Sequence, residues 1–109
     1  MFNYEITVVR FHNNDTDNTA YIGRGSPFGN PYPSTPTQSR DNVCDQYEIY
    51  FNNQLTNNPD FFTSLQDLHN QGKRDGYLRL GCFCKPYRCH GDTIKKFLDD
   101  NRDLFENQE

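Results

Sequence analysis

The chain has 109 residues, of which 33% are apolar, and a formal net charge of −4 at neutral pH. This length suits one hydrophobic core and is too short for two, so we expect a single domain over residues 1–109. The negative charge argues against a protein that coats duplex DNA, because such proteins present a basic face. Nucleic acid stays open as a partner only through a local basic patch.

No segment approaches the roughly 20 apolar residues of a membrane helix, and the amino terminus lacks the apolar core of a signal peptide. We therefore expect a cytoplasmic protein with no membrane partner, in the host cytoplasm if a phage encodes it. In that compartment cysteines are typically thiols or metal ligands rather than disulfides. The four cysteines are Cys44, Cys82, Cys84 and Cys89.

Two strands and a long irregular segment are predicted in the amino-terminal part. Residues 4–11 are β-branched and aromatic, which favours a strand, and residues 12–18 are turn formers. Residues 19–22 form a second, short strand. The glycines and prolines of residues 23–38 exclude regular structure there.

Two helices are predicted to follow. Ser39 or Asp41 caps the first, because the apolar residues after it have helical spacing. Asn58 and Pro59 are the cap and first residue of the second helix, which is expected to stop at Gly72.

A third strand over residues 77–83 is followed by a last helix, which begins at Gly91 and runs to about Phe105. The whole order predicts an α/β domain with a small, mostly parallel sheet flanked by about three helices. The first and last strands then end at the same edge, where open α/β sheets bind ligands. His12 and His69 lie among Asn and Asp residues and are expected to be exposed, and Cys44 is expected to be a packed small residue.

The segment from Cys82 to Asp92, here called the cysteine loop, joins the last strand to the last helix. The start of a helix offers unpaired backbone N–H groups and a positive dipole end, which together favour an anion. In the interpretation that we favour, the loop binds an anion or nucleotide through Arg88, His90 and Gly91, and the cysteines pack as small apolar residues.

Two other interpretations of the cysteine loop stay open. Cys82, Cys84, Cys89 and His90 could together bind zinc, although their spacing is unlike that of ordinary structural zinc sites. Alternatively Cys89 is a nucleophile, since a neighbouring arginine and histidine lower the pKa of a thiol. We favour no metal and no other cofactor.

Residues 23–31, here called the glycine loop, are the second candidate site segment. Its glycines permit backbone angles that other residues avoid, and its prolines stiffen it. A long surface turn in which Phe28 fills the core is the alternative, but loops of this length are often functional. The residues expected to contact a ligand here are Gly23, Arg24, Gly25, Ser26, Gly29 and Asn30.

Residues 21–31 and 81–92 together resemble a family of small phage and bacterial proteins known as a domain of unknown function. Its members share a Gly-Arg-x-Ser-x-x-Gly-Asn-Pro loop and a Cys-x-Cys-x-x-x-x-Cys-His-Gly-Asp segment. The resemblance covers nearly the whole chain and implies no reaction; it does not extend to Arg88. It implies a site made of Gly23, Arg24, Ser26, Gly29, Asn30, Pro31, Cys82, Cys84, Cys89, His90, Gly91 and Asp92.

We expect the two loops to meet and to bind a phosphorylated ligand: a nucleotide, a nucleotide derivative or a nucleic-acid end. Arg24 or Asn30 should then lie within reach of His90 or Asp92. One alternative is a nucleotide-processing enzyme in which Cys89 or His90 acts and Asp92 orients His90. Another is a small zinc-bearing protein-interaction factor. The sequence decides neither whether the protein is an enzyme nor its oligomeric state.

Overall fold

The fold is known from a computed structural model that describes residues 4–11, 19–23, 25–31, 39–82 and 90–106. In chain order, its elements are β1 (Glu5–Arg10), β2 (Thr19–Tyr21), α1 (Arg40–Asn57), α2 (Pro59–Asp75), β3 (Tyr77–Cys82), α3 (Gly91–Asp100) and α4 (Arg102–Glu106). This confirms the predicted α/β class. None of the described helices has the length and apolar character needed to cross a membrane.

The three strands form one parallel sheet in the order β1-β3-β2. On one side of β3, Arg10 pairs with Cys82, and on the other side Tyr21 pairs with Gly81. All three strands therefore end at the same edge of the sheet, which we call the carboxyl edge. The predicted parallel sheet, with its first and last strands ending together, is confirmed.

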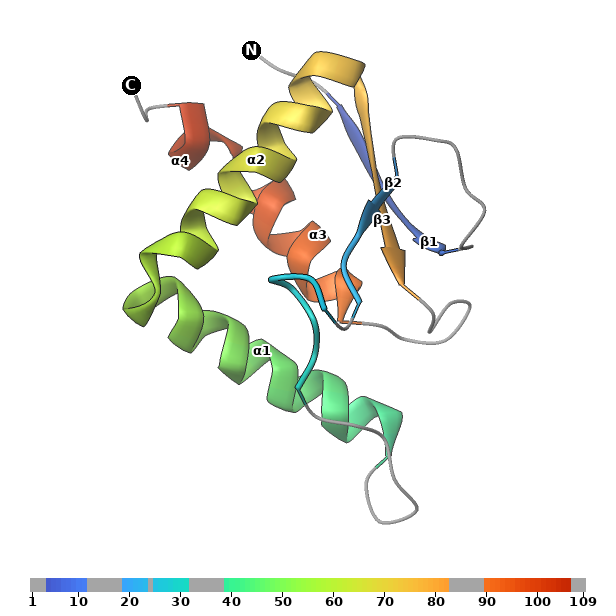
Figure 1. Cartoon of the computed structure of the whole chain (residues 1–109), viewed down its shortest axis with the longest axis vertical. Helices are drawn as coiled ribbons and strands as arrows, with labels where there is room; N and C mark the ends of the chain where they lie inside the picture. Colours follow the sequence, from blue (N-terminus) through green and yellow to red (C-terminus); the bar gives the residue numbers. More distant parts are fainter. Residues whose placement is uncertain (1–3, 12–18, 24, 32–38, 83–89, 107–109) are drawn as a thin grey trace.

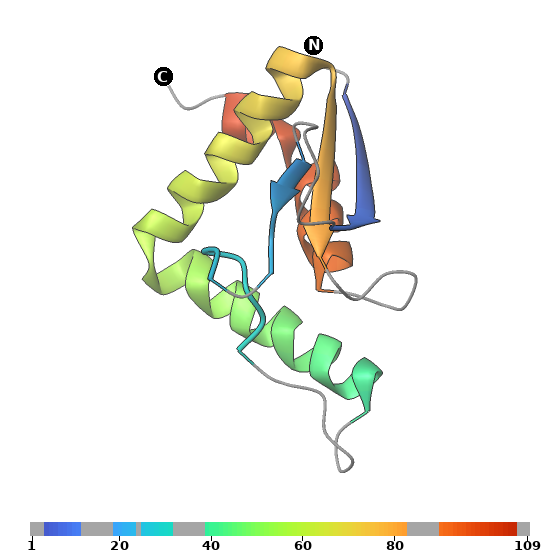
Figure 2. The ribbon, with the colours of Figure 1, turned by 45° about the vertical axis from the view of Figure 1, so that its right-hand side comes forward.

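The helices that pack on the strands, α2 and α3, lie on one face of the sheet, which we call its inner face, while α1 packs against α2 and runs beneath the carboxyl edge (Figure 1). Alternate strand residues such as Ile6 and Leu80 point to this face, where they pack against Leu65 of α2 and Leu98 of α3. Turning the molecule shows α3 running alongside β1 and β3 (Figure 2). The hydrophobic core therefore lies between one face of the sheet and the helices.

The helix starts follow from capping side chains. Ser39 Oγ accepts a hydrogen bond from the backbone N–H of Asn42 at 3.1 Å, so Ser39 is the cap of α1. Asn58 Oδ1 accepts from the backbone N–H of Asp60 at 3.2 Å, and Pro59 opens α2. Both predicted starts are confirmed, because a cap satisfies donors that the helix itself cannot.

Replacing Asn58 by alanine should lower the free energy of unfolding by about 1 kcal/mol, because the cap at the start of α2 is lost. Asn53→Ala is the matched control, since Asn53 is exposed in the interior of α1, where alanine is the better helix former. Urea unfolding of both variants measures the difference. Equal effects of the two substitutions would contradict a capping role for Asn58.

The predicted end of α2 at Gly72 is wrong, because the helix continues to Asp75. Gly76, with φ +81°, is the left-handed residue that ends it, and its N–H donates to Gly72 O at 2.8 Å. Gly72 has a different role: a Cβ there would overlap the ring of Tyr4. This glycine therefore lets a core tyrosine pack directly against the helix backbone.

The prediction that His69 is exposed is also wrong. His69 is fully buried, its Nδ1 is hydrogen-bonded to Tyr4 Oη at 2.8 Å, and its ring stacks on Phe105 with centroids 5.3 Å apart. Helical spacing places it with Leu65 and Gly72 on the inward side of α2, although its neighbours in sequence are polar. His12 lies outside the described residues.

The last predicted helix is divided at Asn101 into α3 and α4. Asn101 Nδ2 donates to Phe97 O at 2.9 Å, so this side chain competes for a carbonyl at the end of α3. The short α4 turns back against α2, where Gln66 Nε2 donates to Phe105 O at 3.3 Å. The turn between α3 and α4 thereby buries Phe105.

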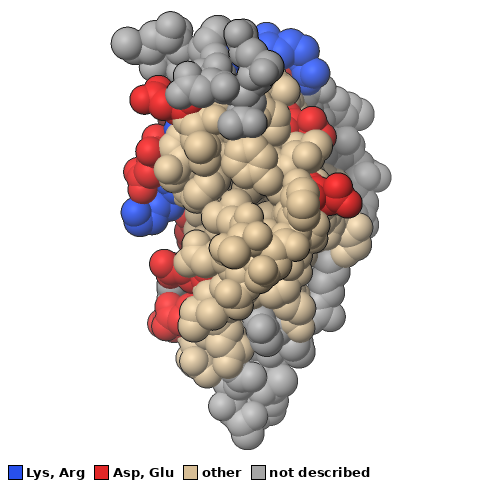
Figure 3. Space-filling view, turned by 90° about the vertical axis from the view of Figure 1, so that its left-hand side faces the viewer, with Lys and Arg blue, Asp and Glu red and all other residues tan. Residues whose placement is uncertain are grey.

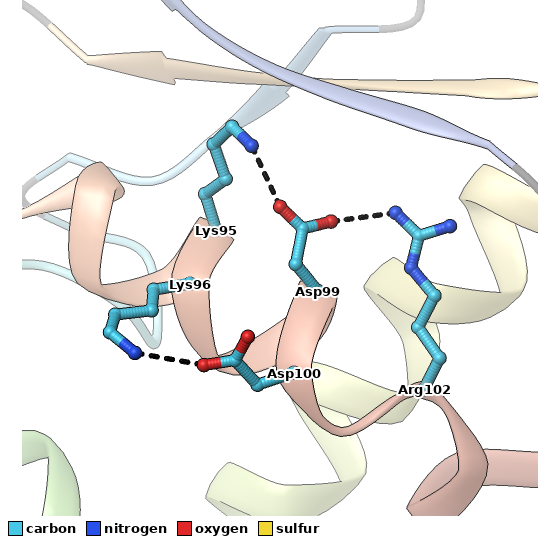
Figure 4. A network of polar contacts seen from close by, with 5 residues as sticks. All are labelled: Lys95, Lys96, Asp99, Asp100 and Arg102. Atoms are coloured by element: carbon cyan, nitrogen blue, oxygen red, sulfur yellow. Dashed lines mark hydrogen bonds and ion pairs between the residues drawn. The ribbon is translucent and has the colours of Figure 1, made fainter.

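Exposed ion pairs connect α3 to α4 (Figure 4). Asp99 accepts hydrogen bonds from Lys95 and from Arg102, each at 2.7 Å, and Lys96 pairs with Asp100 at 2.8 Å. Burial raises the pKa of Asp99, but the hydrogen bonds from Lys95 and Arg102 outweigh it and lower that pKa overall. Because surface pairs contribute little individually, the network orients α4 more than it stabilises the fold.

Candidate functional site

His90 connects the end of the cysteine loop to the beginning of the glycine loop. It immediately precedes α3, is 6% exposed, and its Nε2 lies 2.6 Å from the carbonyl oxygen of Ile22. Because a carbonyl oxygen can only accept, His90 Nε2 carries the hydrogen and donates it. Ile22 lies between β2 and the glycine loop, so this bond holds the beginning of that loop beside the start of α3.

Gly91 explains how closely these segments approach. A Cβ at Gly91 would lie 2.8 Å from Ile22 Cδ1 and 2.9 Å from Val8 Cγ1, well inside the usual contact distance between carbon atoms. The first turn of α3 therefore packs directly against β1 and the end of β2. A larger residue at this position would require the Ile22 and Val8 side chains, or the helix start itself, to shift.

Tyr47 of α1 makes a second contact to the glycine loop. It was not among the site residues predicted from the sequence. It is fully buried, and its Oη donates to the carbonyl oxygen of Phe28 at 2.8 Å. Its ring also meets the ring of His90 edge-on, with centroids 4.9 Å apart. Tyr47 and His90 thus hold two carbonyl groups of one connected segment. The helical spacing of the apolar residues in α1 predicts a helix there but not this contact.

The described part of the glycine loop is held by its own hydrogen bonds. Ser26 donates to Gly23 O through both its N–H, at 3.1 Å, and its Oγ, at 2.7 Å. Ser26 Oγ in turn accepts from the N–H of Phe28 at 3.2 Å. Gly25 has φ +94°, which favours glycine there. Ser26 therefore shapes the turn, and buried Phe28 anchors the loop to the core.

Burial determines the charge state of His90. It lowers the pKa of His90, while the hydrogen bond to Ile22 and the nearby Asp92 carboxylate oppose the shift without cancelling it. His90 is therefore neutral at pH 7, with its hydrogen on Nε2. In this form it positions the glycine loop and contributes no net charge to a bound anion. Burial, with a smaller effect from Tyr50, raises the pKa of Tyr47, which keeps its hydroxyl a donor.

The structure places His90 and Gly91, at the end of the cysteine loop, beside Ile22, the residue that precedes the glycine loop. Asp92 is exposed in the first turn of α3. Arg24 lies outside the described part, so its predicted proximity to His90 or Asp92 stays a prediction, and so does the predicted proximity of Asn30, which is described. The predicted site residues within the described part are Gly23, Gly25, Ser26, Gly29, Asn30, Pro31, Cys82, His90, Gly91 and Asp92, whereas Arg24, Cys84, Arg88 and Cys89 lie outside it.

Two cysteines can be assigned. Cys44 is a buried residue of α1, which confirms the expected packing role. Cys82 ends β3, is buried and is disulfide-bonded, so the expectation of a thiol or metal ligand there is wrong for this structure. Within the described ranges, no group of three His, Cys, Asp or Glu side chains could hold a metal ion. Zinc binding at Cys82 would require its reduction, because thiolates bind the metal.

Arg10 is a further residue of this region that the sequence analysis did not assign. It ends β1, is exposed, and pairs in register with Cys82. Alternation along the strand puts it on the same face as Val8, whose methyl groups lie close to Gly91. A cationic side chain therefore stands at the carboxyl edge near the start of α3. The strand that contains Arg10 was predictable from the sequence, but the residues around Arg10 are determined by the sheet register.

Comparison with known proteins identifies one family. Residues 8–100 match the profile of the family described as a domain of unknown function, DUF4326. The match extends from β1 to the end of α3 and includes both candidate segments. No curated protein and no solved structure is significantly similar to the chain.

Proposed function

The chain belongs to the DUF4326 family, and we propose that it binds a phosphorylated ligand, a nucleotide or nucleotide derivative, between the glycine loop and the start of α3. The observation that carries the proposal is the hydrogen bond from His90 Nε2 to Ile22 O. It holds the glycine loop beside a helix start at the edge where three parallel strands end. Ligands of open α/β sheets bind beyond this edge, and helix starts favour phosphate.

The charged side chains near the start of α3 support an anionic ligand that is bound by few cationic side chains of the protein. Arg10 stands at the carboxyl edge, and Asp92 is an opposing negative charge in the first turn of α3. Because His90 is neutral, the attraction for an anion in this region comes from the positive end of the α3 dipole and from the charge of Arg10. A ligand with one or two phosphates suits this arrangement better than a long polyanion.

The side of the molecule that faces away from the sheet has a different distribution of charge. Figure 3 views the side that α1 and α2 cover, where uncharged residues occupy the centre and acidic residues lie along both margins. A basic surface for nucleic acid is therefore not evident among the described residues of this side. The enzyme and zinc alternatives depend on Cys84 and Cys89, which lie outside the described residues.

Calorimetric titration with inorganic phosphate, ribose 5-phosphate and a panel of nucleoside monophosphates tests the proposal. We expect the wild type to bind at least one organic phosphate with a Kd below about 1 mM. Arg10→Gln should weaken that binding roughly tenfold, because a charge-assisted hydrogen bond is lost.

Arg74→Gln is the matched control, because Arg74 lies at the far end of α2, before β3 begins, and pairs with Asp75 at 3.0 Å. It should leave binding unchanged. No binding of any phosphorylated compound at millimolar concentration would refute the proposal. Equal losses in the two arginine variants would show that bulk charge, not the carboxyl edge, governs affinity.

A further inference from the structure

The outer face of the sheet, opposite the helices, is unusual for parallel strands. Parallel sheets are normally covered by helices on both faces, but here α2 and α3 pack on the inner face and α1 runs beneath the carboxyl edge (Figures 1 and 2). Among the described elements, no helix packs on the outer face. Strand alternation assigns to it Glu5, Thr7, Val9 and Phe11 from the β1 side, Tyr77, Arg79 and Gly81 from β3, and Thr19 and Tyr21 from β2.

Two aromatic rings meet on the outer face across the central strand. Phe11 follows β1 and Tyr21 ends β2, on opposite sides of β3, yet their ring centroids are 4.9 Å apart. Strands so separated lie about 9–10 Å apart, so the rings must lean over the strand between them. Gly81 permits this, because a Cβ there would lie 2.8 Å from Phe11 Cδ1 and 2.7 Å from Thr19 Cγ2.

This ring pair adjoins the glycine loop. A Cβ at Gly23 would lie 2.5 Å from Tyr21 Oη and 2.6 Å from Tyr21 Cζ, so the tyrosine ring extends along the chain to the first residue of the loop. Both Phe11 and Tyr21 are partly exposed. An aromatic surface thus continues from the outer face to the carboxyl edge, where the phosphate of the proposed ligand would lie.

We propose that the Phe11–Tyr21 pair stacks the base of a free nucleotide whose phosphate is held at the carboxyl edge. This inference rests on the proposed function and narrows its ligand to compounds that carry a nucleobase. Base stacking on aromatic side chains tolerates any base, because every base has a π face. A free nucleotide fits better than a strand, because the other end of the face presents the exposed Glu5 carboxylate, and there Arg79 already lies over Tyr77, 5.1 Å from the ring centroid.

A tryptophan reporter tests where the base lies. The chain contains no Trp, so Tyr21→Trp supplies one fluorophore at the proposed stacking position and retains an aromatic plane. Addition of AMP should quench its emission at the same concentrations at which calorimetry detects binding. Tyr77→Trp is the control on the same face at the opposite edge, and its emission should not change. Equal responses, or no response at position 21 while AMP binds, would overturn the inference.

Affinity measurements separate this inference from the proposed function. Tyr21→Leu should weaken AMP binding roughly tenfold and leave ribose 5-phosphate binding unchanged, whereas Tyr21→Phe, which keeps the ring, should bind both like the wild type. If the wild type binds AMP and ribose 5-phosphate equally well, the base platform is wrong while the phosphate site stands. If it binds neither, both fail. Tighter binding of a short single-stranded oligonucleotide than of AMP would overturn the choice of a free nucleotide.

Discussion

Gly72→Ala is expected to lower the free energy of unfolding by about 1–3 kcal/mol, the usual cost of overpacking a core. In an exposed helix interior the same change would raise stability by about 1 kcal/mol, because alanine is the better helix former. At Gly72 the added methyl group would overlap the Tyr4 ring. That ring cannot move aside easily, since His69 Nδ1 is bonded to its hydroxyl and the Arg102 guanidinium lies 4.0 Å from its centroid.

Asn70→Ala is the control for Gly72→Ala, because Asn70 is exposed on the same helix. It should leave stability unchanged or raise it slightly. Urea unfolding monitored by circular dichroism measures both variants. If alanine at position 72 stabilises the protein, Tyr4 does not pack against the backbone of α2 as described.

His90→Ala should lower the free energy of unfolding by about 2–4 kcal/mol. The substitution leaves the buried carbonyl of Ile22 without the donor at 2.6 Å, which costs roughly 1–3 kcal/mol. It also removes a ring that packs edge-on against Tyr47, and truncation of a buried ring adds a cavity term. His90→Gln keeps an N–H donor and should recover part of the loss.

The pH dependence identifies the charge state of His90. Burial lowers its pKa in the folded protein, while in the unfolded chain the pKa is near 6.5. Between these two values the unfolded chain binds more protons, so stability falls as the pH drops below about 6.5 and levels off below the folded pKa. Above pH 6.5 the contribution is constant.

Urea unfolding between pH 5 and pH 8 compares the wild type with His90→Gln, which cannot titrate at position 90. The stability of the wild type relative to the variant should decrease as the pH falls, and His69, present in both proteins, cancels from the difference. Parallel curves for the two proteins would show that His90 has the same pKa in the folded and unfolded states.

Local signals in the sequence were sufficient for most elements. Ser39 and Asn58 begin α1 and α2 as predicted, because a cap acts on donors only two or three residues away. The β-branched and aromatic strands and their order were likewise predictable, and with them a parallel sheet whose strands end at one edge. The glycine loop and the helix start at Gly91 were expected to meet there, and the bond from His90 to Ile22 connects their starting points.

Local patterns in the amino-acid sequence were thus enough to predict the α/β class, the strand and helix order and the segments that reach the carboxyl edge. Long-range packing selects which glycine ends α2, because Gly72 and Gly76 carry the same helix-ending signal until Tyr4 packs on the first. It also determines that His69 is buried and that Tyr47 holds the glycine loop. These contacts join residues 65 and 19 positions apart, and local propensity carries no information on such pairs, since packing and sheet register select them.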